Sequence, residues 1–80
     1  MAMYFFDLRI DQAVASDDEG TELPDIEAAH DEALEALGSA LQEIVVSAKS
    51  DQRFAVQVRD NYGPVFEISA VLESRSLRKQ

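Results

Sequence analysis

The longest periodic pattern of apolar positions in the chain covers residues 25–48 and predicts one amphipathic helix. Its apolar residues recur at steps of three and four, the spacing that gathers side chains on one helix face. The predicted stripe contains Ile26, Ala29, Ala33, Leu37, Ala40, Leu41, Ile44 and Ala48, with Leu34 and Val45 widening it. We expect the shorter elements before and after the helix to pack against this apolar face.

The residues before the helix carry signals for its start. Asp25 is the expected N-cap, because its carboxylate can accept from backbone N–H groups of the first turn that otherwise lack partners. Pro24 favours an extended conformation at Leu23, which we expect to pack against the first turn. Ala29 suits close packing. Gly38 weakens the helix by about 1 kcal/mol relative to alanine, which indicates close packing against a strand, simple tolerance or a hinge.

Alternating apolar and polar residues predict strands over residues 3–10, 53–60 and 65–72. A shorter strand over residues 13–16 follows a turn at Asp11-Gln12, and residues 61–64 form a turn, so the last two strands make a hairpin. The predicted inward residues are Tyr4, Phe6, Leu8, Ile10, Phe54, Val56, Val58, Phe66, Ile68, Ala70 and Leu72.

The order strand, strand, helix, strand, strand predicts a two-layer α+β fold with one helix on an antiparallel sheet. Residues 1–72 form this single domain, and residues 73–80 are expected to be a flexible polar tail. The sheet face away from the helix is mostly polar, apart from Phe5, Val65 and Val71. If these three cluster, they form an apolar patch suited to self-association, and an exposed edge strand is a second route to a partner.

The chain has 80 residues, enough for one small core. A core of this size supplies only a few kcal/mol, and dimerisation is a common way to bury more surface. We therefore expect a non-enzymatic protein-interaction module that forms a homodimer.

The net charge is −9, with −10 in residues 1–50 and +1 in residues 51–80. This charge argues against nucleic acid as a partner, because phosphate binding depends on Lys and Arg. The acidity serves solubility or offers a surface to a basic protein, including one that itself binds nucleic acid. No apolar run reaches the roughly 18 residues of a membrane span, and the start lacks a secretory signal pattern, so we expect a cytoplasmic protein.

Residues 17–24 form an acidic loop in which Gly20 is expected to take a positive φ and Asp17 to bond the backbone of the turn. The carboxylates Asp17, Asp18, Glu19 and Glu22 are candidate ligands for a divalent cation. They lack the spacing of an EF-hand loop, and a solvated turn explains them equally. A metal or small-ligand binder that uses residues 17–25 is the alternative function.

Other chemistry has little support in the sequence. Glu27 and His30 match the Glu-x-x-His pattern of di-iron bundles, but those sites need further copies from other helices, and this chain has one histidine. There is no cysteine, no glycine-rich phosphate loop and no surrounding motif for any serine. We predict no catalytic residues and no cofactor.

Three segments resemble a family of small bacterial domains of unknown function, and the similarity covers roughly residues 3–72. They are M-Y-F-F-D-L-R at 3–9, D-D-E-G-T-E-L-P-D-I-E-A-A at 17–29 and F-A-V-Q-V-R-D at 54–60. The middle segment is the most specific one. The resemblance implies a single compact domain with no assigned activity. The family often has glycine in the first hairpin turn, where this chain has Asp11-Gln12.

Overall fold

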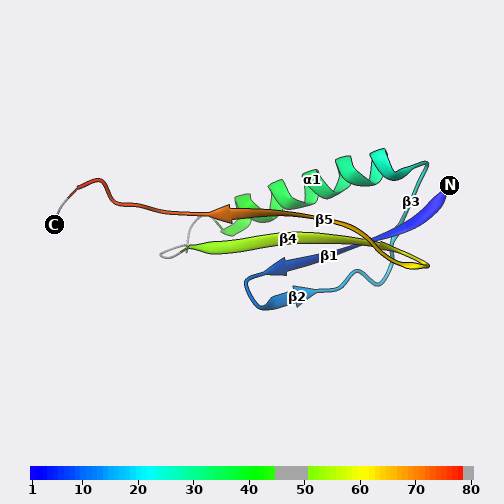
Figure 1. Cartoon of the computed structure of the whole chain (residues 1–80), viewed down its shortest axis with the longest axis horizontal. Coiled ribbons are helices and arrows are strands. Elements are labelled where there is room, and N and C mark those ends of the chain that lie inside the picture. The colour runs from blue at the N-terminus through cyan, green and yellow to red at the C-terminus, as the bar shows by residue number, and fades with distance from the viewer. Residues whose placement is uncertain (45–50, 79–80) are drawn as a thin grey trace.

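The computed structural model describes residues 1–44 and 51–78, without the side chain of Ile44. Its elements are β1 (Ala2–Ile10), β2 (Ala13–Ala15), β3 (Thr21–Leu23), α1 (Ile26–Ile44), β4 (Gln52–Asp60) and β5 (Gly63–Leu72). One helix lies on one face of a five-stranded antiparallel sheet (Figure 1). The predicted two-layer α+β fold is confirmed.

The sheet has the order β2-β1-β4-β5, and β3 pairs with β1 beside β2. The turn Asp11-Gln12 joins β1 to β2 as predicted. Asp11 has a φ of 52°, a conformation that glycine adopts more easily. Its side chain compensates, because Oδ1 accepts from the N–H of Arg53 (3.0 Å) at the start of β4. This contact ties the first hairpin to the next strand of the sheet.

The segment Thr21–Leu23 differs from the predicted loop, because it forms the short strand β3. Its residues pair with the beginning of β1, with Ala2 opposite Leu23 and Tyr4 opposite Thr21. The segment is too short to show a sequence period, and Thr21 and Glu22 are exposed. Its strand conformation depends on the hydrogen-bonding partner that β1 supplies.

The predicted inward faces of the three long strands are confirmed. Tyr4, Phe54, Val56 and Val58 are buried in the core, and the remaining inward residues of β1 and β5 pack against them. The helix contributes Ala29, Ala33, Leu37 and Ala40. Small side chains at three of these four helix positions let α1 approach the sheet closely, and Leu23 packs at the edge of the same core.

The apolar stripe of the helix is narrower than predicted. Ile26 is 51% exposed and Leu34 is 49% exposed, so their assignment to the buried face is wrong. A single sheet contacts only one side of a helix, and residues at the margin of the stripe stay in solvent. The N-cap is confirmed, because the N–H of Ala28 donates to Oδ1 of Asp25 at 2.9 Å. The predicted helical residues 45–48 lie outside the described residues.

Gly38 lies on the exposed side of α1, and no atom lies within 4 Å of a Cβ added there. Close packing therefore does not explain this glycine. We expect Gly38→Ala to raise the free energy of unfolding by about 0.5–1 kcal/mol, because alanine restricts the unfolded chain and favours helix. Urea unfolding at one fixed protein concentration measures the change. A lower stability for the variant would contradict the structure at this position.

Candidate functional site

The outer edge of β1 is closed by three short segments in succession. β2 pairs with Leu8 to Ile10, and β3 pairs with Ala2 to Tyr4. Between them the N–H of Phe6 donates to Oδ2 of Asp17 at 3.1 Å. The carboxylate of Asp17 thus takes the place of a strand partner where neither short strand reaches. These segments together line this side of β1 from Ala2 to Ile10.

Asp17 also organises its own loop, as the sequence predicted. Its Oδ1 accepts from the N–H groups of Glu19 and Gly20, each at 3.1 Å. Gly20 has a φ of 76°, which confirms the predicted positive angle. The loop between β2 and β3 is therefore folded around one carboxylate.

A polar network fixes this loop to the sheet face that the helix leaves open, here called the helix-free face. Nε of Arg59 donates to Oδ2 of Asp7 at 2.9 Å, and the N–H of Asp17 donates to Oδ1 of Asp7 at 2.9 Å. The Arg59 guanidinium also donates to the carbonyl oxygen of Asp17 (2.8 Å) and lies 4.5 Å from the centre of the Phe5 ring. The sequence offered no sign of this network, because its members come from β1, β4 and the loop.

The network changes the acidity of both carboxyls. Burial alone would raise the pKa of Asp7, but hydrogen bonds from Arg59 and from the Asp17 N–H, with the charge of Arg59, outweigh it. Burial likewise opposes ionisation of Asp17, and the N–H groups of Gly20, Phe6 and Glu19 outweigh it. The pKa of each group lies below its ordinary value of 3.8.

These shifts set the direction of the acid response. A carboxyl with a lowered pKa in the folded state contributes stability that is present above the unfolded pKa and is lost as pH falls through the folded value. We expect the free energy of unfolding to decrease as the pH drops below 3.8, the ordinary pKa of both carboxyls. The decrease should continue as the pH passes through their lower pKa values in the folded state. Urea unfolding across that acid range measures it. Asp7→Asn should flatten the acid slope and Asp18→Asn should not; equal slopes in both variants would contradict the network.

The candidate metal ligands do not share one arrangement. Asp17 directs its carboxylate to backbone N–H groups, whereas Asp18, Glu19 and Glu22 are exposed. Within residues 1–44 and 51–78, no three His, Asp or Glu side chains converge as a metal site would require. The hydrogen bonds of Asp17 thus hold the backbone of its own loop.

The helix-free face has a shallow hollow of about 210 Å³ between β2, β1, β4 and β5. It is lined by Asp7, Arg9, Val14, Ser16, Ala55, Gln57 and Glu67. Ala55 was predicted to point away from the helix; it lines this hollow on the helix-free face and is nevertheless buried. Its lining carries both acidic side chains (Asp7, Glu67) and a basic one (Arg9), so its charge does not favour either an anionic or a cationic ligand.

The three apolar residues predicted on the helix-free face do not make one patch. Phe5 lies opposite Arg59 and is covered by its guanidinium. Val65 is partly buried beside the irregularity in β5 that faces Val58 and Arg59. Val71 lies opposite Arg53, toward the other end of β5, and is 55% exposed. Of the three, Val71 is the residue that remains open to a partner.

The outer edge of β5 has no neighbouring strand among the described residues. Backbone groups of alternate residues face opposite sides of a strand. The carbonyl oxygen of Arg53 accepts from the N–H of Asp11 at 2.8 Å, so Phe54 and Val56 face β5 and bond to Ala70 and Ile68. The N–H and C=O groups of Glu67, Ser69 and Val71 consequently face outward, and we call this row the β5 edge.

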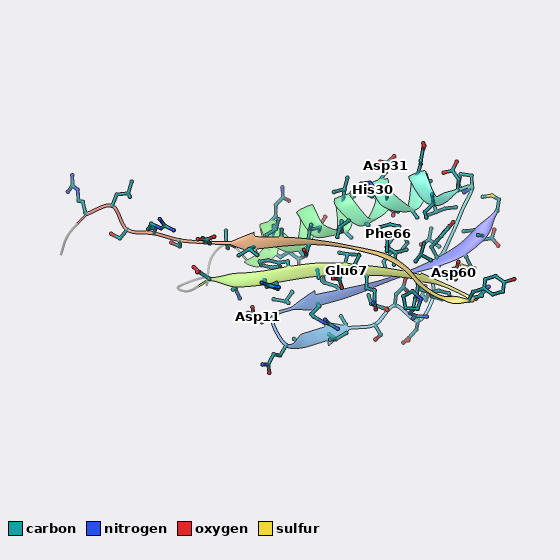
Figure 2. The ribbon with its side chains drawn as sticks, viewed as in Figure 1. Asp11, His30, Asp31, Asp60, Phe66 and Glu67 are labelled. Atoms are coloured by element: carbon teal, nitrogen blue, oxygen red, sulfur yellow. The ribbon has the colours of Figure 1, made fainter. Side chains whose placement is uncertain are left out.

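Partly exposed apolar side chains lie next to the β5 edge, on the face of the sheet that α1 covers. The ring of His30 lies 5.7 Å from the ring of Phe66, which places this side of α1 over β5 (Figure 2). Leu34 follows His30 by one helical turn and shares that side. Phe66, Ile68 and Leu72 of β5 are only partly buried. The β5 edge therefore adjoins an incompletely covered margin of the core.

No described helix is long and apolar enough to cross a membrane. Comparison of the chain with curated proteins and with solved structures finds no significant match. Residues 3–71 match the family described as Domain of unknown function (DUF6894). The match takes in the helix and all five strands except the first residue of β1 and the last residue of β5. The chain belongs to this family of small domains, DUF6894.

Proposed function

We propose that this domain is a non-enzymatic protein-interaction module that assembles as a homodimer. The observation that carries the proposal is the β5 edge, a row of outward-facing backbone groups on a strand of 10 residues that no other described strand pairs with. Long open edges pair readily with another chain, and proteins that stay monomeric usually shorten, charge or cover them. β5 carries one charged residue, Glu67, and no lysine.

The contrast between the two sides of the sheet supports this proposal. The β1 side is closed by β2, β3 and the Asp17 carboxylate, and both short strands have 3 residues. The β5 side has no such closure within the described residues and exposes Val71. A partner strand there would satisfy backbone groups and cover apolar surface at the same time.

The test compares two valine variants at opposite edges of the sheet. Val71 is 55% exposed and faces Arg53, and Val14 is 54% exposed and faces Arg9. Sedimentation equilibrium of the unchanged protein is expected to give twice the 8.9 kDa chain mass. We expect Val71→Glu to shift the protein toward monomer, because an acidic side chain on the edge opposes pairing, and Val14→Glu to remain a dimer. A monomer at all concentrations for the unchanged protein would refute the proposal.

A basic protein is the partner class that the surface charge supports beyond self-association. The outer side of α1 exposes Asp31, Glu32 and Glu35 (Figure 2 labels Asp31). Like charges on one helix face attract a partner of opposite sign, and added salt weakens such contacts. Recovery of a basic protein whose binding does not respond to salt would argue against this use of the helix.

The alternative function, a metal or small-ligand binder at residues 17–25, has less support. Asp17 and Asp25 begin and end this segment, and their carboxylate oxygens already accept hydrogen bonds from backbone N–H groups. A ligand that stabilises the folded state raises its melting temperature. A higher melting temperature in millimolar calcium or magnesium, reversed by a chelator, would favour this alternative over the interaction module.

A further inference from the structure

We propose that two copies of the chain pair antiparallel along β5, with the two-fold axis passing midway between Ser69 of one strand and Ser69 of the other. This inference rests on the proposed homodimer and adds its interface and register. Two sheets of five strands would then join into one continuous sheet, with both helices on the same face. The occupant of the β5 edge is thus a second copy of this chain.

The regular part of β5 determines where such a pair can form. The pairing with β4 shifts between Val58 and Arg59, which leaves an irregularity near Val65. Pro64 precedes it and has no N–H to donate. β5 ends at Leu72. Regular geometry therefore covers residues 66–72, and the midpoint of this stretch is Ser69. An antiparallel pair centred there uses the whole stretch and avoids Pro64.

The outward-facing backbone groups agree with this register. Ser69 belongs to the β5 edge, so Ser69 would face the second copy's Ser69 as a hydrogen-bonded pair. Glu67 would face Val71 of the second copy on either side of the axis. A pair centred on Glu67 would instead set two carboxylates directly opposite each other, which is destabilising. The register centred on Ser69 avoids this contact between like charges.

In the same register, the side chains on the helix-covered face of one β5 strand fit those of the second copy. Phe66 would lie opposite Leu72 of the second copy, and Ile68 opposite Ala70. All of these residues are apolar and only partly buried in the single chain. Each pair places a large side chain against a smaller or more flexible one. The second copy thereby completes the margin of the core that one chain leaves uncovered.

Leu34 provides a further contact from the helix. It is 49% exposed and lies one turn after His30, on the side of α1 that covers β5. The two-fold axis would run the helices of the two copies in opposite directions above the joined strands. The acidic N-terminal half of one helix would then lie beside the C-terminal half of the other, which separates the two acidic halves.

Cysteine cross-linking of the full chain tests the register, and the chain has no cysteine of its own. A hydrogen-bonded antiparallel pair has Cα atoms about 5.5 Å apart, within the range a disulfide accepts. We expect Ser69→Cys to give a cross-linked dimer on mild oxidation. Glu67→Cys alone and Val71→Cys alone should not cross-link, because the offset in this register is on the order of 13 Å. An equal mixture of these two variants should cross-link again.

The outcomes separate the register from the proposed function. Cross-linking of Ser69→Cys, with the two flanking variants joining only when mixed, supports the pairing. A dimer by sedimentation in which Glu67→Cys or Val71→Cys cross-links alone overturns the register and leaves the interaction module standing. A dimer in which none of these cysteines cross-links places the interface away from β5. A monomer with no cross-link refutes both proposals, and an extended peptide from another protein then becomes the occupant to seek.

Discussion

Replacing Asp17 with alanine is expected to lower the free energy of unfolding by about 2–3 kcal/mol, a large share of the stability of so small a domain. The variant removes the acceptor for the N–H of Phe6, which is partly buried and faces the outer side of β1 between the stretches that β2 and β3 cover. It also removes the acceptor for the N–H groups of Glu19 and Gly20. An amide left without a partner costs more than the net value of the bond.

Chemical unfolding at one fixed protein concentration measures this loss, because the stability of the proposed dimer would depend on protein concentration. Asp18→Ala is the matched control, since Asp18 is adjacent, exposed and equal in charge. Its effect should stay within about 0.5 kcal/mol. Hydrogen exchange gives a second measurement: the Phe6 amide should lose protection in Asp17→Ala while the Val56 amide keeps it. Equal stability of the two alanine variants would contradict the hydrogen bond from the Phe6 N–H to Asp17 at the outer side of β1.

Gly20→Ala is expected to lower the free energy of unfolding by about 1–3 kcal/mol. Two independent causes act in the same direction. The φ of 76° disfavours any residue with a Cβ atom. An added Cβ would also lie 2.8 Å from Cε2 of Phe5 and 3.0 Å from the sulfur of Met3. The Phe5 ring cannot withdraw freely, because Arg59 lies across it.

Gly63→Ala separates the two causes, since Gly63 also has a positive φ, of 126°, but no atom lies within 4 Å of an added Cβ. We expect Gly63→Ala to cost backbone strain alone and Gly20→Ala to add a contact that disturbs the Asp7–Arg59 pair. Urea unfolding across the acid pH range tests this: the dependence of the free energy of unfolding on pH should change in Gly20→Ala and stay the same in Gly63→Ala. If Gly20→Ala proved as stable as the unchanged protein, the loop would have to be folded differently from the structure.

Part of this structure could be predicted because the controlling interactions are local. A helix of several turns shows its period over many residues, and the Asp25 cap lies next to the turn it serves. The long strands show theirs through alternation, which identified the core residues of β4, Phe54, Val56 and Val58. Gly20 and Asp17 were recognised as turn residues because their conformational preferences act within the loop itself.

The site shows where such prediction ends. Thr21–Leu23 has no period of its own and becomes a strand through pairing with β1. The second role of Asp17, as acceptor for Phe6, joins residues separated by 11 positions, and the Asp7–Arg59 bond joins residues separated by 52. Leu34 was predicted to widen the buried stripe that contains Leu37, yet Leu34 is 49% exposed and Leu37 is buried. Period alone does not say how wide a face the sheet will cover.

The sequence by itself determined the fold class, the long elements and their buried faces, because hydrophobic periodicity and capping act between neighbours in the chain. Only the tertiary structure decided that short segments line the outer side of β1 and that β5 is the last strand of the sheet among the described residues. Strand order depends on which segments meet after long loops close, and no local preference records it. The proposed interface follows from that order, since the same residues of β5 would be unavailable in the middle of the sheet.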